Sequence, residues 1–147
     1  MTIKVGEKVP EGGFAVMGAD GPGGVTTDEL FGGKKVVLFS VPGAFTPACS
    51  ATHLPGYVAN ADSIKAKGVD TVACLAVNDV FVMNAWGTGA GADGKVTMLA
   101  DGNGDFTKAL GLELDASGFG MGTRGLRFAL IVDDGVVSHS FVEESPS

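Results

Sequence analysis

Cysteine is scarce in this sequence of 147 residues, which contains only Cys49 and Cys74. Two cysteines do not make a disulfide framework, so a reducing compartment is expected. No secretory signal is visible at the N-terminus, which favours a cytoplasmic location, with the mature form of an organellar protein as the alternative. The cysteines and the two histidines are scattered without the spacing of metal ligands, so no metal site is predicted.

Long apolar runs and clusters of basic residues are also lacking. No apolar run approaches the ~18 residues that a transmembrane helix needs, so no membrane contact is expected. Ten Lys and Arg against 17 Asp and Glu give a net charge of −7, which is the wrong sign for nucleic acid or anionic lipid. Hydrophobic residues make up 45% of the chain. This composition and length predict a single globular domain spanning residues 1–147.

Glycine, by contrast, is abundant, with 24 residues against an average usage of about 7%. Many of these glycines gather in turn-like stretches such as residues 21–24 and 87–94, which we interpret as loops. Asp20-Gly21 divides residues 14–27 into two short apolar pieces, which predicts an N-terminal hairpin. Asp134-Gly135 likewise separates two apolar runs and predicts a hairpin near the C-terminus.

The apolar pattern between these hairpins alternates between strand and helix. Continuous apolar runs predict buried strands over residues 35–41, 69–77 and 96–100, and helical spacing predicts helices over residues 47–67, 80–86 and 105–110. Such alternation predicts an α/β fold, in which a central mixed sheet, mostly parallel with one antiparallel hairpin, has helices on both faces. The second helix is expected to face the core with Phe81, Met83 and Trp86.

The stretch VPGAFTPAC, residues 41–49, joins the first buried strand to the first long helix. Thr46 can cap this helix and Pro47 suits its first position, which places Cys49 in the first turn. A helix N-terminus favours the thiolate, the reactive form of cysteine, and ligands bind at the carboxyl ends of strands in open α/β sheets. The equally weighted alternative is a small buried cysteine with a packing role.

A lowered pKa alone does not make a thiol a fast nucleophile. Lowering the pKa from ~8.5 to ~6 raises the thiolate fraction roughly thirtyfold, but the lower basicity cancels roughly tenfold of that gain. Fixed donors and a cation are therefore needed to stabilise the transition state. Thr46 can place a hydroxyl beside the sulfur of Cys49, and a distant arginine must supply the cation.

Residues 42–58, PGAFTPACSATHLPGYV, resemble the peroxidatic loop and helix of the peroxiredoxins. The family signature is a proline, three residues, a threonine, two residues and a cysteine, and here it falls on Pro42, Thr46 and Cys49. The blocks at 77–87, 98–115 and 127–135 resemble the type II and type V subfamily, in the same order. The resemblance runs from about residue 3 to residue 144.

The resemblance implies a thioredoxin-like fold and a thiol-dependent peroxidase with an antioxidant role. Cys49 corresponds to the peroxidatic cysteine, which reduces hydrogen peroxide or alkyl hydroperoxides and becomes a sulfenic acid. Thr46 corresponds to the threonine that contacts peroxide and thiolate, Arg127 to the arginine that pairs with both, and Pro42 to the proline that shields the pocket. Arg124 is a weaker candidate for the cation. No metal, haem or flavin is implied as a cofactor.

The resemblance also implies partners. The reductant is glutaredoxin with glutathione, or thioredoxin, and the chain is expected to form a homodimer with Phe45 and Phe81 as contacts. Cys74 could resolve the sulfenic acid of Cys49, or it could be a core cysteine of its strand. The C-terminal helix that relatives carry after the position of Glu144 is expected to be missing here.

His53 lies four residues after Cys49 and is expected to pack behind the site, with a role as a base or hydrogen-bond partner as the alternative, whereas His139 is expected to be exposed. Two rival functions remain open. One is a cysteine hydrolase that uses Cys49 with His53 or His139. The other is a thioredoxin-fold redox-signalling module in which Cys49 is oxidised without efficient turnover.

Overall fold

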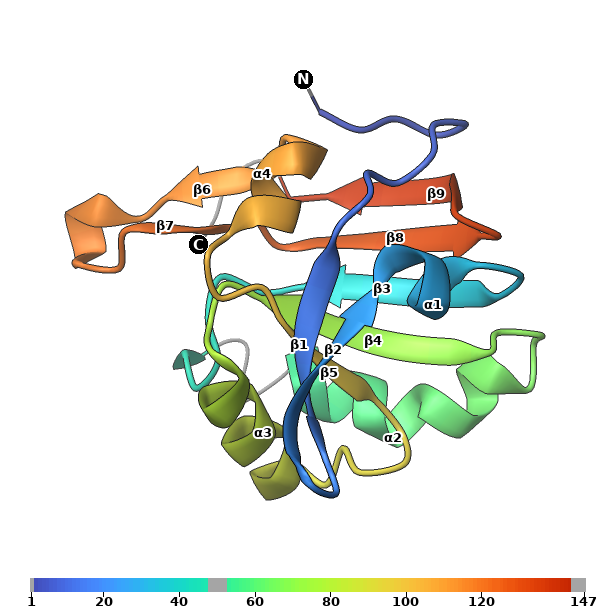
Figure 1. Ribbon diagram of the computed structural model, residues 1–147, viewed down its shortest axis with the longest axis horizontal. Coiled ribbons are helices and arrows are strands. Elements are labelled where there is room, and N and C mark those ends of the chain that lie inside the picture. The colour runs from blue at the N-terminus through green and yellow to red at the C-terminus, as the bar shows by residue number, and fades with distance from the viewer. Residues whose placement is uncertain (1, 48–52, 144–147) are drawn as a thin grey trace.

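The computed structural model describes residues 2–47 and 53–143. Its centre is a seven-stranded sheet in the order β2-β1-β5-β4-β3-β8-β9 (Figure 1). The strands of this sheet are β1 (Gly13–Gly18), β2 (Gly21–Thr26), β3 (Lys35–Ser40), β4 (Thr71–Ala76), β5 (Thr97–Ala100), β8 (Phe128–Asp133) and β9 (Val136–Val142). The helices are α1 (Thr27–Phe31), α2 (Leu54–Lys65), α3 (Val80–Gly89) and α4 (Asp105–Leu110).

The sheet is mixed, and only β3, β4 and β5 run parallel to one another. The N-terminal hairpin β1–β2 joins antiparallel to β5, and the hairpin β8–β9 joins antiparallel to β3. The predicted α/β fold and both predicted hairpins are confirmed. The predicted mixed sheet is confirmed too, but its parallel part is smaller than expected, because each hairpin adds its strands antiparallel at its own side of the parallel centre.

Alternation along the strands divides the core into two clusters. On β4, Ala73 and Leu75 point to one face, where Phe31 of α1 and Leu110 of α4 pack. Cys74 points to the opposite face, where the apolar side chains of α2 and α3 pack. Side chains of successive strand residues point to opposite faces of a sheet. The continuous apolar run of β4 therefore supplies buried side chains to both faces. The prediction of helices on both faces is thereby confirmed.

Helix α3 is longer than the sequence predicted, and the face that it buries differs in part from the predicted one. Asp79 caps it by accepting a hydrogen bond from the Val82 amide at 2.9 Å, and the helix continues through Gly89 into the stretch predicted as a loop. At Gly87 a Cβ atom would stand 2.6 Å from Met98 Cγ, so glycine allows the helix to approach β5. Met83 and Trp86 are buried, as predicted.

Phe81, by contrast, is 63% exposed, so its predicted core position is wrong. The reason is the helical period of 3.6 residues, which places residues two apart on nearly opposite sides of a helix. Because Met83 faces the core, Phe81 faces outward.

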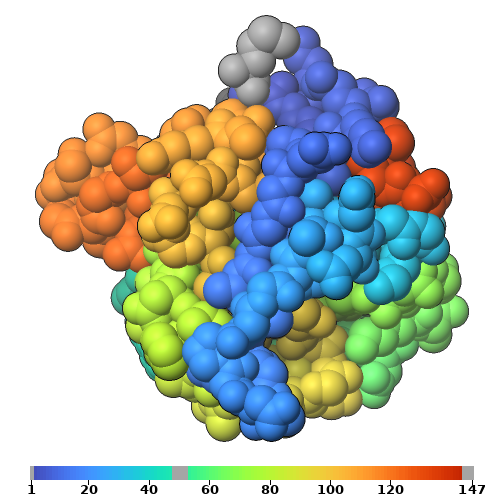
Figure 2. Space-filling model, viewed as in Figure 1, coloured from blue at the N-terminus to red at the C-terminus, as the bar shows by residue number. Residues whose placement is uncertain are grey.

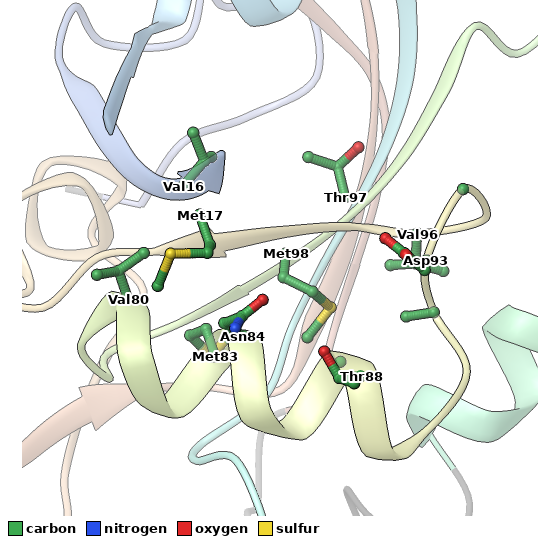
Figure 3. A pocket seen from close by; sticks show the side chains of 13 residues that line it. Val16, Met17, Val80, Met83, Asn84, Thr88, Asp93, Val96, Thr97 and Met98 are labelled. Atoms are coloured by element: carbon green, nitrogen blue, oxygen red, sulfur yellow. The ribbon is translucent and has the colours of Figure 1, made fainter. Parts of the chain in front are cut away.

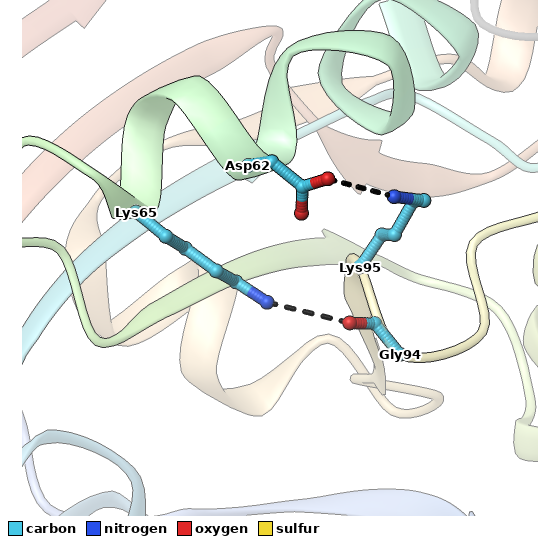
Figure 4. A network of polar contacts seen from close by, with 4 residues as sticks. All are labelled: Asp62, Lys65, Gly94 and Lys95. Atoms are coloured by element: carbon cyan, nitrogen blue, oxygen red, sulfur yellow. Dashed lines mark hydrogen bonds and ion pairs between the residues drawn. The ribbon is translucent and has the colours of Figure 1, made fainter.

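Helix α2 begins at Leu54, after His53 at its N-cap, and buries Leu54 and Ala61 against the sheet. Pro47 is already helical, whereas residues 48–52 of the predicted helix lie outside the described residues. On its outer side, Asp62 pairs with Lys95 at 3.2 Å and Lys65 donates to the Gly94 carbonyl at 3.4 Å (Figure 4). Exposed pairs of this kind contribute at most about 1 kcal/mol, so burial of the apolar face is what holds α2.

Two further features were not expected from the sequence. Helix α1 begins with a capping box, in which Thr26 and Glu29 exchange hydrogen bonds between side chain and backbone. The strands β6 (Glu113–Asp115) and β7 (Thr123–Gly125), joined through the 3-10 turn η2 (Ser117–Phe119), form a separate two-stranded ribbon. Figure 2 shows this ribbon as a lobe beside the main body. No helix in the described part of the chain is long and apolar enough to cross a membrane.

Candidate active site

The loop after β3 is fixed by its own turn and by the neighbouring strand β4. The Gly43 carbonyl accepts hydrogen bonds from the Thr46 amide at 3.4 Å and from Thr46 Oγ1 at 2.8 Å. The Ala44 amide donates to Asn78 Oδ1 at 2.9 Å, just beyond the end of β4. Between them, Phe45 has a φ of 64°, a left-handed conformation that non-glycine residues adopt mainly where the surroundings impose it.

Thr46 therefore presents its hydroxyl in a defined orientation. The hydroxyl donates its hydrogen bond to the Gly43 carbonyl. The lone pairs of Oγ1 therefore remain to accept a hydrogen bond from a ligand. Pro42 is half-buried in the same loop. Cys49 lies outside the described residues. Pro47, two residues before it, is helical, in agreement with the predicted helix start.

Arg127 lies between β7 and β8 and faces a cavity of about 370 Å³. Its side chain is 11% exposed, and its Nη1 pairs with Glu143 Oε2 at 3.3 Å. The Glu143 amide also donates to the Arg127 carbonyl at 2.9 Å. The lining residues are Phe39, Ser40, His53, Tyr57, Arg127, Phe128, Ala129, Phe141, Val142 and Glu143. A mostly buried cation in a largely apolar cavity can stabilise negative charge on a small ligand.

Two neutral polar groups share this cavity with Arg127. Burial lowers the pKa of His53, and the positive charge of Arg127 lowers it further, while Glu143 acts in the opposite direction. His53 is therefore held in its neutral form near pH 7. The Ser40 hydroxyl, at the end of β3, has no hydrogen-bond partner among the described residues. The structure thus brings His53 and Arg127 together, as part of one cavity.

Arg124, the weaker candidate for the cation, is placed elsewhere. Its Nε donates to the Met121 carbonyl and its Nη1 to the Val77 carbonyl, both at 2.9 Å. Its side chain is not part of the wall around His53. Of the two arginines, Arg127 is the one beside the cavity.

Cys74 occupies the middle of β4 and is fully buried. On its side of the sheet, the Tyr57 ring stacks on Phe39 with centroids 3.7 Å apart and planes 4° apart. Burial, and to a smaller extent Cys74, raise the pKa of the Tyr57 hydroxyl, and Tyr57 packs against the core cluster that contains Cys74. The core position of Cys74 is confirmed, and its resolving role stays a prediction.

Sequence reasoning missed Glu143, Tyr57 and Asn78. Glu143 is one of 17 acidic residues, and nothing in its spacing marks it as the partner of Arg127. Tyr57 follows the apolar spacing of its helix, which gives no sign that it lines the cavity. A polar side chain directly after a buried strand, such as Asn78 after β4, is the one signal that could have indicated a role at this edge of the sheet.

A second cavity, of about 220 Å³, lies between α3 and the strands β1 and β5 (Figure 3). Met17, Met83 and Met98 supply much of its apolar wall, with Asn84 and Thr88 at its polar side. Among the described residues, none of the predicted site residues lines it, so the cavity at Arg127 is the better candidate.

A mixed sheet with helices on both faces, with the Thr46 loop and then α2 following the carboxyl end of β3, is the architecture of the thioredoxin-like class. A family model described as Redoxin matches residues 4–147. Chloroplastic peroxiredoxin-2E-2 of Oryza sativa subsp. japonica is 50% identical in an alignment that covers 97% of this chain and 66% of the rice protein. Peroxiredoxin-2B of Arabidopsis thaliana is 46% identical, over 96% of this chain and 88% of its own length.

The structural comparison agrees with the sequence comparisons. Reduced Prx3 from Vibrio vulnificus, crystallised in complex with H2O2, matches with a TM-score of 0.95 and 51% identity, over 99% of this chain and 91% of that chain. This chain belongs to the peroxiredoxins, a family of thiol peroxidases. The type II relatives and the thioredoxin-like fold expected from the sequence are confirmed. The chain spans just under two thirds of the length of the rice relative.

Proposed function

We propose that this chain reduces hydrogen peroxide and alkyl hydroperoxides with the thiolate of Cys49. The main support is the Arg127 guanidinium, which is 11% exposed and lies with neutral His53 in one cavity. Membership of the peroxiredoxins supports the same conclusion, as does the V. vulnificus structure that was solved with H2O2.

In the proposed reaction the Cys49 thiolate attacks one peroxide oxygen. The S–O bond forms as the O–O bond breaks, so the sulfur is oxidised to a sulfenic acid and the leaving oxygen takes up a proton to become water or an alcohol. The Thr46 hydroxyl donates a hydrogen bond to the Gly43 carbonyl, so its oxygen can accept a hydrogen bond from the O–H of the peroxide. Arg127 stabilises the negative charge that develops on the leaving oxygen, and Pro42 shields the site from water.

Recycling requires two thiols. A first thiol condenses with the sulfenic acid to form a disulfide and water, and a second thiol then releases Cys49. We propose that glutathione with glutaredoxin, or thioredoxin, supplies these thiols. Full burial of Cys74 beside the Phe39–Tyr57 stack favours an external thiol over Cys74 in the first of these steps.

Intact mass spectrometry tests the proposal directly. Reduced protein is mixed with one equivalent of hydroperoxide and quenched within seconds. Gain of one oxygen is the expected result and means a one-cysteine cycle, whereas loss of two hydrogens means a Cys49–Cys74 disulfide. Cys74→Ser should still gain the oxygen, and Cys49→Ser should not. An unchanged mass of the wild-type chain would contradict the proposal.

Turnover separates the enzyme from the redox-signalling alternative. With glutathione and glutaredoxin, or with thioredoxin and its reductase, the wild-type chain should consume peroxide continuously, and Cys49→Ser should not. A single rapid oxidation without continued consumption under either system would favour a signalling module.

We also propose that the chain acts as one domain over residues 1–147 and as a homodimer. Phe45 and Phe81 are 59% and 63% exposed, and Phe45 lies against Trp86 of α3 with ring centroids 6.4 Å apart. These two rings support a contact surface around α3. The expected lack of a C-terminal helix after the position of Glu144 falls outside the described residues.

The cytoplasmic location also stays a proposal. The rice relative is named as chloroplastic, so the organellar alternative has its own support. Fractionation of source cells with an antibody against this chain decides between them, because recovery in the organelle fraction would contradict a cytoplasmic protein.

A further inference from the structure

Arg124 connects three separate parts of the chain around the Thr46 loop. It lies on β7 of the projecting ribbon, where its Nε donates to the Met121 carbonyl at 2.9 Å. Its Nη1 donates at 2.9 Å to the carbonyl of Val77, a residue 47 positions earlier that directly follows β4. The guanidinium therefore joins the ribbon to the carboxyl end of the central strand.

The same guanidinium packs against Gly43, the residue that orients Thr46. A Cβ atom on Gly43 would stand 3.6 Å from Arg124 Nη1, 3.4 Å from Met121 Cε and 3.2 Å from Thr46 Cγ2. Gly43 is buried, so Thr46 and the ribbon enclose it closely. Its carbonyl accepts the hydroxyl proton of Thr46 at 2.8 Å. A shift of Gly43 would therefore rotate or release that hydroxyl.

The residue that accepts the hydrogen bond of Arg124 is the sequence neighbour of the residue that holds the Thr46 loop. Val77 accepts from Arg124, and its neighbour Asn78 accepts from the Ala44 amide at 2.9 Å. Arg124 and Ala44 are thus both hydrogen-bonded to residues at the end of β4, and Gly43 lies between them. The loop cannot move relative to β4 without breaking the hydrogen bond to Asn78 or displacing the guanidinium.

We propose that Arg124 is a positioning residue for peroxide reduction, and this inference rests on the function proposed above. Arg124 holds Gly43 in place, and Gly43 in turn fixes the orientation of Thr46 Oγ1 toward the peroxide. Arg124 itself contacts neither peroxide nor sulfur. Lysine cannot replace it, because one ammonium group on a flexible stem does not reproduce two donors in a rigid plane.

The test compares two reactions of Cys49 in the full-length chain. The first is oxidation by hydroperoxide in a single turnover, followed by quenched mass spectrometry. The second is alkylation by iodoacetamide at the same pH, which needs the thiolate but not the acceptor on Thr46. Arg124→Gln and Arg124→Lys should both slow oxidation about tenfold to a hundredfold, because misplacement by about 1 Å can cost a hundredfold. Alkylation should change less than twofold.

Lys108→Gln is the matched control for loss of one positive charge, since Lys108 is exposed on α4. It should leave both rates unchanged. A double-mutant cycle with Thr46→Val adds the readout that a purely structural role would not move. Once Thr46 has lost its hydroxyl, Arg124→Gln should slow oxidation by less than twofold further, because the two residues act through one hydrogen bond.

Three results would overturn the inference. They are an Arg124→Lys variant that is oxidised as fast as wild type, equal slowing of oxidation and alkylation, and effects of Thr46→Val and Arg124→Gln that multiply independently. If Arg124→Gln does not fold, Arg124→Lys carries each comparison. Failure of the wild-type chain to be oxidised at all would instead refute the proposed peroxidase, and the inference with it.

Discussion

Burial and two charged neighbours set the protonation state of His53 at the site. His53 precedes α2 and lines the same cavity as Arg127 and Glu143. Burial and the guanidinium both disfavour a second positive charge, so the pKa of His53 is lowered in the folded protein. A neutral imidazole can accept or donate one hydrogen bond, but it does not supply the cation that the chemistry needs. In the proposed reaction, Arg127 supplies that cation.

The lowered pKa of His53 predicts a loss of stability in mild acid. The unfolded chain takes up a proton near pH 6.5, the ordinary value for histidine, whereas the folded chain resists it. The free energy of unfolding should therefore fall as the pH drops below about 6.5, and this fall should level off below the folded pKa. Urea unfolding at pH 7.5 and at pH 5.5 measures the difference, and His53→Gln should reduce it.

His139→Gln is the matched control for that experiment, because His139 is the only other histidine and is exposed on β9. It should retain the pH dependence of the wild-type chain. A His53→Gln variant with an undiminished loss of stability between the two pH values would show that other groups cause it.

At the level of elements, β4 lies at the centre of the seven-stranded sheet, with three strands on either side. Its residues face both core clusters, and Cys74 is fully buried in it. A central strand between two cores is among the last parts of a protein to open. Exposure of Cys74 should therefore require nearly global unfolding.

Thiol labelling checks this expectation for β4. In a Cys49→Ser variant, Cys74 is the remaining thiol, and in native buffer it should react with a disulfide reagent at least about a thousandfold more slowly than in strong urea. That ratio follows from a free energy of opening near the typical 5 kcal/mol or more of global unfolding. Reaction within a few-fold of the unfolded rate would mean that β4 opens readily, and it would strengthen the case for Cys74 as a resolving cysteine.

The strands and long helices were predictable because their periodicity is strong over five or more residues. The pairing of Arg127 with Glu143 was not predictable, and a β-bulge is the reason. Val132 is opposite Val137, but after a register shift Ile131 is opposite His139, and Phe128 is opposite Val142. This single inserted residue brings Glu143, in place of Val142, opposite Arg127. A bulge leaves no reliable mark in the apolar pattern.

The predicted site residues came from two sources with different reach. Spacing alone indicated Cys49 and Thr46, because they follow a buried strand and precede a helix. Arg127 lies 78 positions after Cys49 in the sequence, and only the family resemblance could point to it. The ribbon β6–β7 escaped prediction because its strands of three residues each are too short to show a period. The contacts of Arg124 were missed with it, although Arg124 itself was named as the weaker candidate for the cation.

At the level of the whole molecule, the sheet supports the site from both sides. The carboxyl ends of β3 and β4 hold the Thr46 loop through Gly43 and Asn78, and the antiparallel strand β8 brings Arg127 to the edge of the same region. Because both cores pack against these strands, the loop and the arginine are placed by the global fold.

The exposed rings around α3 predict how the molecule associates. Phe45 and Phe81 are each more than half exposed, and burying a phenylalanine contributes about 2 kcal/mol. If both rings are buried in a homodimer, the double variant Phe45→Ser/Phe81→Ser removes them from both protomers, so it should weaken dimerisation by more than about a thousandfold and sediment as a monomer at micromolar concentration. Phe141→Ser is the matched control, because Phe141 is also 63% exposed but lies on β9. Analytical ultracentrifugation compares the three proteins. A dimeric double variant would place the interface elsewhere, and a wild-type chain that stays monomeric at 100 times that concentration would contradict the dimer itself.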